Sequence, residues 1–442
     1  MYPNLYYVFK DWFGVEWKPL SFLNTFGLMV AMGFVAAAWI LTIELRRKEK
    51  QGLLLPREEM ITVGKPATIF DLITNALLGF AFGYKFLGLF FSKPDMVSPQ
   101  EYIFSNQGNL IGGIIIALLM AGLKWWDKNK HQLKEPERRV VRIWPHDRVG
   151  DIIIMGLVFG ILGAKLFDNL EHWDEFWANP IERLLSQSGL TFYGGLILAS
   201  IAICWYAVNK SIKLKHLVDA AAPALMIAYA IGRIGCQVSG DGDWGIYNSA
   251  YISDNTGKVV LANKDDFQKM LNTDSTYFLK GEVWENEDSR RIYVTDRTYP
   301  SLASVPHQSI KAPSFLPVWF FAYSYPQNVN KDGISMPGVT DEHNRVLPSP
   351  VFPTPLYETL ICTILFFIMW FNRNRIKTPY LMFGLYLSLN GSERFLIEMM
   401  RVNRSYGSLK LTQAEIIALL LIASGLLLIL IAKKTNKKVE IE

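Results

Sequence analysis

Nine apolar stretches dominate the pattern of hydrophobic and polar positions along the chain. Each is about 18 to 23 residues long, close to the length that an α-helix needs to cross the hydrocarbon core of a bilayer. They are residues 22–44, 70–92, 109–126, 151–169, 189–208, 217–236, 351–371, 379–399 and 414–432. The pattern predicts an all-α polytopic membrane protein with about nine transmembrane helices.

Lysine and arginine are concentrated in alternate connections between these stretches. The basic segments are residues 46–50, 124–148, 209–215, 372–377 and the tail after 432. The connections at 93–108 and 170–188 are instead rich in aspartate and glutamate. Because basic loops stay on the cytoplasmic side, we expect the N-terminus outside and the C-terminus in the cytoplasm.

A polar stretch interrupts the pattern between the sixth and seventh spans. Residues 237–350 are enough for a small domain of about 110 residues. Alternating runs at 291–294 and 318–323 favour strands. We therefore expect helices 1–6 within 1–236, a partly β insertion domain on the outer (periplasmic) side at 237–350, and helices 7–9 within 351–442. A passive cap and a role in substrate access both remain open for it.

The composition excludes a soluble protein. Of the 442 residues, 50% are hydrophobic, 13% aromatic and only 19% charged, and the net charge is +5. The three cysteines lie in apolar segments, so neither a disulfide framework nor a zinc site is expected. The first twenty residues lack the features of a signal peptide, and their aromatic residues suit a membrane interface.

The stretch from Tyr229 to Gly245 places Arg233 inside the sixth span. A cation there costs roughly 2.5–3.5 kcal/mol on insertion scales, so it needs a partner or a function. Glycines, which allow close approach of a ligand, follow the apolar part of this segment at 232, 235, 240, 242 and 245. Together these features indicate a site for an anionic group, and the abundant anion in a bilayer is a phospholipid headgroup.

Other polar residues inside the spans are candidates for the same site. Glu358 lies in the seventh span, and Glu393, Arg394 and Glu398 lie in the eighth. Arg394 and Glu398 are four residues apart, so an ion pair within the helix is the simple alternative. Asp219 precedes Arg233 by fourteen residues, or about 21 Å along a helix, so the two cannot pair directly; a helix cap is the alternative for Asp219.

The fifth span begins with Tyr193, Gly194 and Gly195. An interfacial tyrosine and close approach of a ligand at the two glycines are both open interpretations. With Arg233, Glu358 and the Arg394–Glu398 pair, these residues converge on the outer half of the bilayer. Two arginines can hold a phosphodiester through paired hydrogen bonds, while carboxylates orient them or accept a proton. The residues alone favour a membrane enzyme or a transporter that handles an anionic lipid.

Several motifs resemble those of the prolipoprotein diacylglyceryl transferase family. The segment G-R-I-G-C-Q-V-S-G-D-G-D-W-G at 232–245 is similar to the signature G-R-x-G-N-F-x-N-G-E-x-x-G. Cys236 replaces its asparagine, and Asp241 stands near its glutamate. P-T-P-L-Y-E ends at Glu358, R-F-L-I-E runs from Arg394 to Glu398, and Arg401 follows where another arginine is common.

The chain also departs from the family pattern. The family's F-H-G-G-L reads F-Y-G-G-L here, so Tyr193 replaces a histidine often proposed as the base. Tyrosine, with a pKa near 10, is a poor general base at neutral pH. Phe26 replaces a tyrosine of the first span. The helical hairpin at 70–126 and the large outer insertion look like additions.

The resemblance implies transfer of an sn-1,2-diacylglyceryl group from phosphatidylglycerol to the lipobox cysteine of a prolipoprotein, with release of glycerol phosphate, in the bacterial inner membrane. It implies catalytic roles for Tyr193, Arg233, Arg394 and Glu398. It implies substrate binding by Gly194, Gly195, Asp219, Gly235, Cys236, Gly240, Asp241, Gly245 and Glu358. No metal, other cofactor or nucleic acid is expected. The alternative function is a transporter or flippase of an anionic lipid.

Overall fold

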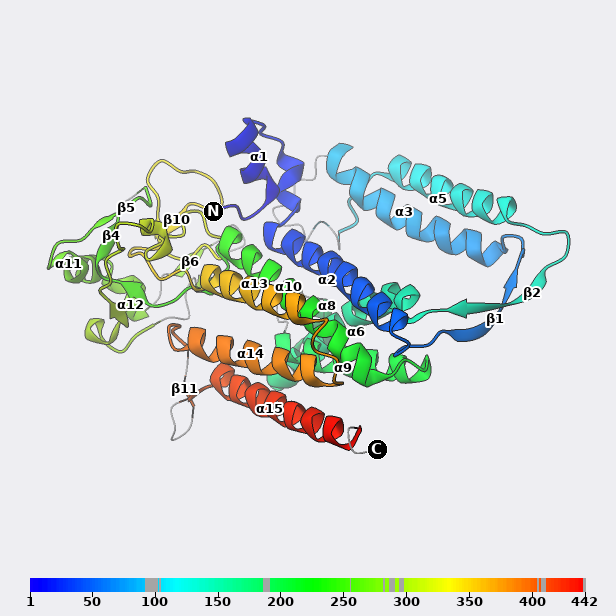
Figure 1. Ribbon diagram of the computed structural model, residues 1–442. Coiled ribbons are helices and arrows are strands. Elements are labelled where there is room, and N and C mark those ends of the chain that lie inside the picture. The colour runs from blue at the N-terminus through cyan, green and yellow to red at the C-terminus, as the bar shows by residue number, and fades with distance from the viewer. Residues whose placement is uncertain are drawn as a thin grey trace. The chain divides into compact units, whose positions relative to one another are not determined.

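The computed structural model describes residues 1–91, 102, 105–185, 191–254, 256–280, 283–285, 291–293, 298–403, 405–406 and 411–439. Within these residues a helix lies at each of the nine predicted spans (Figure 1). They are α2 (Thr25–Lys50), α3 (Ile69–Phe91), α5 (Leu110–Lys130), α6 (Val149–Glu171), α9 (Phe192–Asn209), α10 (Leu214–Ser239), α13 (Thr354–Asn372), α14 (Leu381–Glu398) and α15 (Gln413–Val439). The predicted acidic connection at 93–108 falls mostly outside the described residues.

Seven of the described helices are long and apolar enough to cross a membrane. They are α2, α3, α5, α6, α10, α13 and α15. The apolar part of α9 is shorter, and α14 contains three charged residues near its end, Glu393, Arg394 and Glu398. The prediction of a largely helical, polytopic membrane protein is confirmed.

The chain divides into two compact units. The first unit holds residues 1–44 and 215–442, and the second holds residues 45–214. This division groups the insertion with the first helix and with the last helices of the chain. The three consecutive parts that the sequence predicts stay a prediction.

Two helical hairpins, packed through glycine, form most of the second unit. In the expected hairpin of α3 and α5, a Cβ on Gly83 would lie 2.6 Å from the Gly112 carbonyl oxygen. In the hairpin of α6 and α9, a Cβ on Gly163 would lie 2.7 Å from the Cβ of Leu198. Such spacing lets helix backbones touch, which is how helices associate where lipid removes the hydrophobic driving force.

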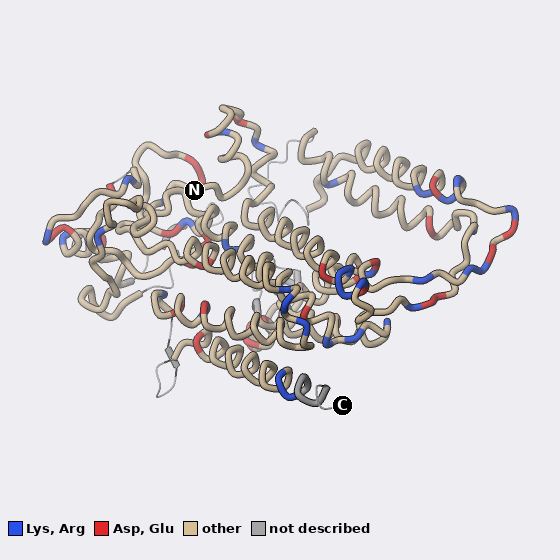
Figure 2. Tube along the Cα trace, viewed as in Figure 1, with Lys and Arg blue, Asp and Glu red and all other residues tan. Residues whose placement is uncertain are grey.

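An antiparallel ribbon of two strands also belongs to this unit, and the sequence pattern did not predict it. Strand β1 (Arg57–Val63) pairs with β2 (Glu137–Ile143), with Arg57 opposite Ile143. The strands carry both signs of charge (Figure 2). Arg142 Nε lies 3.0 Å from Glu58 Oε1. The predicted basic connection at 124–148 is thus partly an ordered strand.

The long helices of the first unit also approach one another closely. A Cβ on Gly33 of α2 would lie 3.2 Å from the Ala228 carbonyl oxygen of α10. Helices α14 and α15 meet where a Cβ on Gly384 would lie 2.9 Å from the Gly425 carbonyl oxygen.

Short elements elsewhere in the chain are α1 (Leu5–Phe13), α7 (Trp173–Ala178), α8 (Pro180–Leu185), β11 (Ser405–Tyr406) and β12 (Leu411–Thr412).

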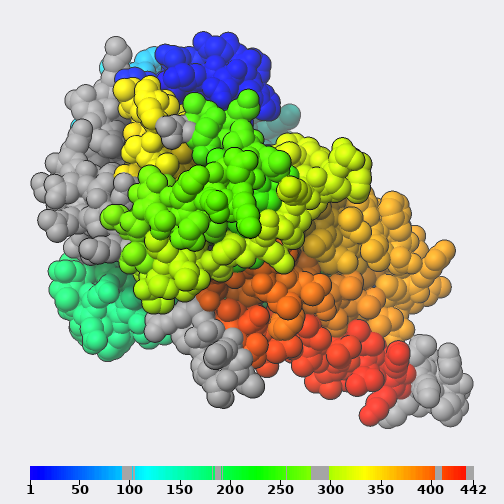
Figure 3. All heavy atoms as spheres, turned by 90° about the vertical axis from the view of Figure 1, so that its left-hand side faces the viewer, coloured from blue at the N-terminus to red at the C-terminus, as the bar shows by residue number. Residues whose placement is uncertain are grey.

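The insertion has its own aromatic core and only short strands. The core includes Trp244, Tyr247, Phe278, Tyr325 and Leu347. Its elements are β3 (Tyr247–Asn248), β4 (Tyr251–Ser253), β5 (Val259–Leu261), α11 (Asp266–Thr273), α12 (Ser275–Lys280), β6 (Val283–Glu285), β7 (Arg291–Tyr293), β8 (His307–Gln308), β9 (Ile334–Ser335) and β10 (Arg345–Val346). Figure 3 shows the insertion, in green to yellow, beside the helices α13–α15 in orange to red.

One of the two strand predictions in the insertion is wrong. Residues Val318–Phe320 form a 3-10 turn instead of a strand. The other run forms β7, which pairs with β6, while Val294 at its end lies outside the described residues.

Backbone hydrogen bonds fasten the insertion to the ends of three helices. Gly245 N donates to Phe352 O at 2.8 Å, just before α13, and Ile246 N donates to Met400 O at 2.9 Å, just after α14. Val329 N donates to Ser239 O at 2.9 Å, at the end of α10. The ends of α10, α13 and α14 are thereby held together on one side.

Glycine packing in the second unit generates a stability prediction. We expect Gly163→Ala to lower the free energy of unfolding by about 1–3 kcal/mol, because its methyl group would overpack the α6–α9 contact. The matched control is Gly160→Ala on the same helix, where an added Cβ meets nothing within 4 Å. That change should be neutral or stabilise by up to about 1 kcal/mol. Equal apparent Tm values for the two variants in detergent would contradict the packing role.

Candidate active site

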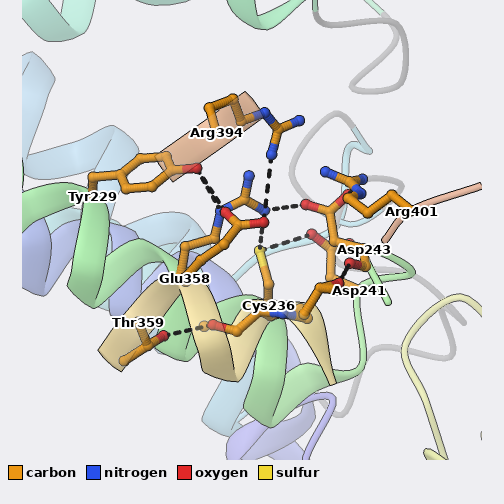
Figure 4. Close-up of polar contacts among 12 residues, drawn as sticks. Tyr229, Cys236, Asp241, Asp243, Glu358, Thr359, Arg394 and Arg401 are labelled. Carbon is orange, nitrogen blue, oxygen red and sulfur yellow. Dashed lines mark hydrogen bonds and ion pairs between the residues drawn. The ribbon is translucent and has the colours of Figure 1, made fainter. Parts of the chain in front are cut away.

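The centre of the site is the carboxylate of Glu358 on α13, whose side chain is 0% exposed. Tyr229 donates a hydrogen bond of 2.7 Å to it from α10. Arg233, one turn further along α10, forms an ion pair with it through Nε, and Arg394 of α14 approaches it at 3.4 Å through Nη1. Three helices therefore meet at one buried negative charge (Figure 4).

Local sequence explains how Tyr229 and Arg233 reach the same carboxylate. Residues four apart lie on one face of a helix. The Arg233 guanidinium carbon also lies 5.2 Å from the centre of the Tyr229 ring, within cation–π range. Pro355 lies in the first turn of α13, where proline is tolerated, and so places Glu358 near the beginning of that helix.

Asp243 holds a second pair of arginines. Its two carboxylate oxygens contact Arg233 Nη1 and Arg401 Nη2. Burial acts to raise the pKa of Asp243, but the guanidiniums of Arg233 and Arg401 outweigh it and lower the pKa to about 2. Asp243 is therefore a permanent anion at neutral pH.

The backbone around Asp243 is fixed from two sides. Thr354 Oγ1 donates a 2.5 Å hydrogen bond to the Asp243 carbonyl oxygen. A Cβ on Gly245 would lie 2.9 Å from the Met400 carbonyl oxygen, so a larger residue would push the segments apart. The signature glycine at 245 is thus required by the close approach of the chain on both sides of the site.

Glu398 completes the charged cluster at the end of α14. Its Oε2 lies 3.6 Å from Arg394 Nη2 and 3.9 Å from Arg401 Nη1. Its Oε1 accepts hydrogen bonds from Asn403 at 2.5 Å and from Thr412 at 2.9 Å. The expected ion pair between Arg394 and Glu398 is present, as part of a larger network.

The ion pairs of the cluster join three arginines to three carboxylates: Arg233, Arg394 and Arg401 to Asp243, Glu358 and Glu398. Removing one member of such a buried set leaves an uncompensated buried charge, which is strongly destabilising. The contacts of Arg394, at 3.4 and 3.6 Å, are longer than the usual 2.7–3.2 Å of an N–H···O hydrogen bond. Arg394 therefore has the weakest hold on its carboxylate partners in the cluster and is the most available to an added anion.

Cys236 and Asp241 lie beside Arg233. The Cys236 thiol is 3.6 Å from Asp241 Oδ2 and 3.8 Å from Arg233 Nη1. Gly240 has a φ of 71°, a left-handed conformation that ends α10 and directs Asp241 back toward the helix. Burial and the negative charge of Asp243 raise the pKa of Asp241 to about 6. Asp241 is thus a half-buried carboxylate that changes its protonation state near physiological pH.

The structure brings together most of the residues that the sequence singled out. Those that meet in the cluster are Arg233, Cys236, Asp241, Glu358, Arg394 and Glu398. Sequence reasoning missed Tyr229 and Asp243 as members, and named Arg401 only from the motif. The available signals were the spacing of four between Tyr229 and Arg233 and the second acidic residue in G-D-G-D-W-G.

Two predicted binding residues of the first unit lie outside the charged cluster. Asp219 accepts backbone hydrogen bonds from Tyr380 N at 2.9 Å and Phe383 N at 3.0 Å. It therefore holds the beginning of α14, a cap on another helix. Gly235 faces α2, where an added Cβ would lie 3.0 Å from the Cβ of Met29 and 3.2 Å from the ring of Phe26.

Tyr193, Gly194 and Gly195 belong to the second unit, at the beginning of α9. Tyr193 is half-buried. A Cβ on Gly194 would press against Phe167 of α6, and one on Gly195 would lie 2.7 Å from the Gly160 carbonyl oxygen. Helix α6 therefore packs closely against these two glycines, and their role in ligand binding stays a prediction.

Among the described residues, no group of three or more His, Cys, Asp or Glu side chains is placed to hold a metal ion. The positive charge of the site comes from Arg233, Arg394 and Arg401.

Comparison with known proteins supplies a family. Residues 130–431 match the family model described as prolipoprotein diacylglyceryl transferase. A phosphatidylglycerol–prolipoprotein diacylglyceryl transferase of Leptospira interrogans is 32% identical over 124 residues, which is 23% of this chain and 39% of the relative. Proteins of the same name from Dehalococcoides mccartyi (34% over 95 residues) and Enterococcus faecalis (36% over 100 residues) each align over 22% of this chain and 36% of the relative. The chain thus spans less than half the length of these curated relatives.

Proposed function

The chain belongs to the prolipoprotein diacylglyceryl transferase family, and we propose that it transfers the sn-1,2-diacylglyceryl group of phosphatidylglycerol to the lipobox cysteine of prolipoproteins. The product is a thioether, glycerol phosphate is released, and the step is the first in bacterial lipoprotein maturation. The observation that carries the proposal is the cluster of three arginines among apolar helices. A phosphodiester in a bilayer is the ligand that such a cluster suits.

All nine long helices span the bacterial inner membrane in this proposal, with the N-terminus and the insertion outside and the C-terminus in the cytoplasm. Lysine and arginine gather at the α13–α14 connection and near the end of α15, which supports that orientation (Figure 2). On α14, Arg394 pairs with Glu358 of α13 and with Glu398 of its own helix, which lowers the cost of placing α14 in lipid.

In the reaction, the thiolate of the lipobox cysteine attacks the glyceryl carbon that carries the phosphate. A carbon–sulfur bond forms, the carbon–oxygen bond breaks, and the electron pair leaves on the phosphate oxygen of glycerol phosphate. Negative charge therefore grows on the phosphate in the transition state, and fixed positive groups at that position accelerate the step. Arg233 and Arg394 supply those groups, while Glu358 and Glu398 orient them.

The thiol proton needs an acceptor, because the thiolate is the reactive form. Asp241 is our assignment, since it is a half-buried carboxylate next to Arg233 with a pKa of about 6. Cys236 and the glycines at 235, 240 and 245 shape the surroundings of the phosphate, and Asp219 positions α14. The roles of Tyr193, Gly194 and Gly195 rest on the family motif alone.

The test is incubation of the purified full chain with phosphatidylglycerol and a lipobox peptide, followed by mass spectrometry. We expect the cysteine to gain one diacylglyceryl unit. Arg233→Lys and Arg394→Lys should each reduce the rate by about 100-fold or more, because lysine cannot reproduce the planar paired donors. The matched control, Arg375→Lys in the exposed α13–α14 connection, should keep full activity. Movement of lipid without a mass gain would instead identify a transporter.

The pH dependence tests the assignment of Asp241. The carboxylate must be deprotonated to accept a proton, so the rate should rise about tenfold per pH unit up to a pH near 6 and then level off. Asp241→Asn should lose this rise along with most activity, and Asp241→Glu should restore it. The exposed control Asp265→Asn should keep the wild-type profile. An unchanged acid limb in Asp241→Asn would exclude Asp241 as the proton acceptor.

A further inference from the structure

An apolar groove separates the insertion from helices α13 and α14. Its volume is about 390 Å³, and its walls include Ile310, Phe320 and Phe321 from the insertion and Tyr357, Ile361 and Ile397 from the helices. Volumes of roughly 300–1,000 Å³ are typical of small-molecule sites. All of these residues belong to the first unit.

The polar groups at the wall of this groove are already used within the protein. Tyr357 donates its hydroxyl to Phe320 O at 2.5 Å. The buried Asn248 donates to Ile310 O at 2.8 Å and Phe321 O at 3.1 Å, and it accepts from Ile310 N at 3.1 Å. The outer wall therefore presents ring and aliphatic carbon to the groove.

The backbone N–H and C=O groups that lie next to the ends of α13 and α14 also have hydrogen-bond partners within the protein. Phe352 donates to Ile246 O at 3.1 Å and accepts from Gly245 N at 2.8 Å, while Met400 O accepts from Ile246 N. An extended peptide in the groove would thus lose the hydrogen bonds that its own N–H and C=O groups make with water. A hydrocarbon chain has no such groups and loses nothing.

The groove begins at the level of the charged cluster. Tyr357 precedes Glu358, Ile397 precedes Glu398, and Met400 precedes Arg401. At its other side it meets the apolar surface of α14, where Leu396 is 61% exposed. One molecule with an anionic head and an apolar tail fits both features.

We propose that the groove holds one acyl chain of the phospholipid whose phosphate binds Arg233 and Arg394, with the insertion as its outer wall. This inference rests on the proposed function and gives the insertion a role in it. The acyl chain moves into the groove from bilayer lipid that is equally apolar. The groove therefore adds little to the affinity for the phospholipid. It fixes the position of the diacylglyceryl group and discriminates between chain lengths.

Photolabelling of the full chain in mixed micelles tests the occupant directly. The probe is phosphatidylglycerol with a diazirine in the middle of one acyl chain. We expect the label on the segment 310–321 of the insertion, and we expect Ile361→Trp, which fills the groove, to remove most of it. The matched control is Ile364→Trp, one turn along on the exposed face of the same helix. Leu396→Trp at the mouth of the groove serves as a second variant if Ile361→Trp does not fold.

Label confined to the exposed faces of α13 and α14, or unchanged in both groove variants, would overturn the proposal. Labelling of segment 310–321 by a diazirine lipobox peptide in place of the lipid would overturn it as well, in favour of a peptide site. These readouts need no catalytic turnover. A labelled groove in a chain that forms no thioether would therefore refute the proposed reaction and keep the acyl-chain site.

Chain-length selectivity tests the consequence for catalysis. We expect Ile361→Trp to shift the ratio of kcat/KM between twelve-carbon and eighteen-carbon phosphatidylglycerols by about tenfold toward the shorter chain, the scale of discrimination in hydrophobic pockets. Ile364→Trp should leave the ratio unchanged. A rate loss in Ile361→Trp that is equal for both lipids would contradict a groove that reads chain length.

Discussion

The buried charge of Glu358 is the constraint on which the site depends. A carboxylate with no exposure is tolerated only beside opposite charge, and Glu358 obtains it from Arg233 of α10 and Arg394 of α14. Three helices separated widely in sequence are thereby tied at one level. Asp243 and Glu398 also form ion pairs with Arg401, so opposite charges alternate through the whole cluster. The cluster thus ties the helices together and also fixes the positions of its three arginines, and both properties follow from the same ion pairs.

Glycine does the corresponding work where the helices carry no charge. Apolar side chains give helices in lipid little reason to associate, so contact of backbones through small residues replaces the hydrophobic effect. Gly163 against α9 and Gly384 against Gly425 are examples, one in each unit. A glycine pair such as Gly194–Gly195 therefore has two meanings in a membrane sequence, helix packing or close approach of a ligand. Which of the two applies depends on the helix that packs beside the pair, and the sequence alone does not identify that helix.

The features that could be predicted from the sequence are those that are unusual in their immediate surroundings. Long apolar runs predicted the nine helices, and Arg233, Glu358, Arg394 and Glu398 were visible because charge in such runs is rare. Asp243 lies just outside a span, where an aspartate is ordinary, so only its contacts reveal it. The ribbon of β1 and β2 pairs segments that a helical hairpin separates in the chain. The alternation at 318–323 suited a strand, yet Phe320 and Phe321 serve as the wall of a groove.

The position of the insertion in the chain links its folding to the chemistry of the site. It leaves from Asp241 and Asp243 and returns at Thr354, only four residues before Glu358. Trp244, adjacent to Asp243, packs against Tyr325 in the core of the insertion, with the ring centroids 4.9 Å apart and the planes tilted by 35°. Tyr325 in turn donates a hydrogen bond to Gln237 of α10. The same core that stabilises the insertion therefore sets the backbone that carries Asp243. A domain inserted at this point must hold its two ends close together, so that Arg233 and Glu358 on either side of it can pair. The backbone hydrogen bonds of Gly245, Ile246 and Val329 hold these ends together.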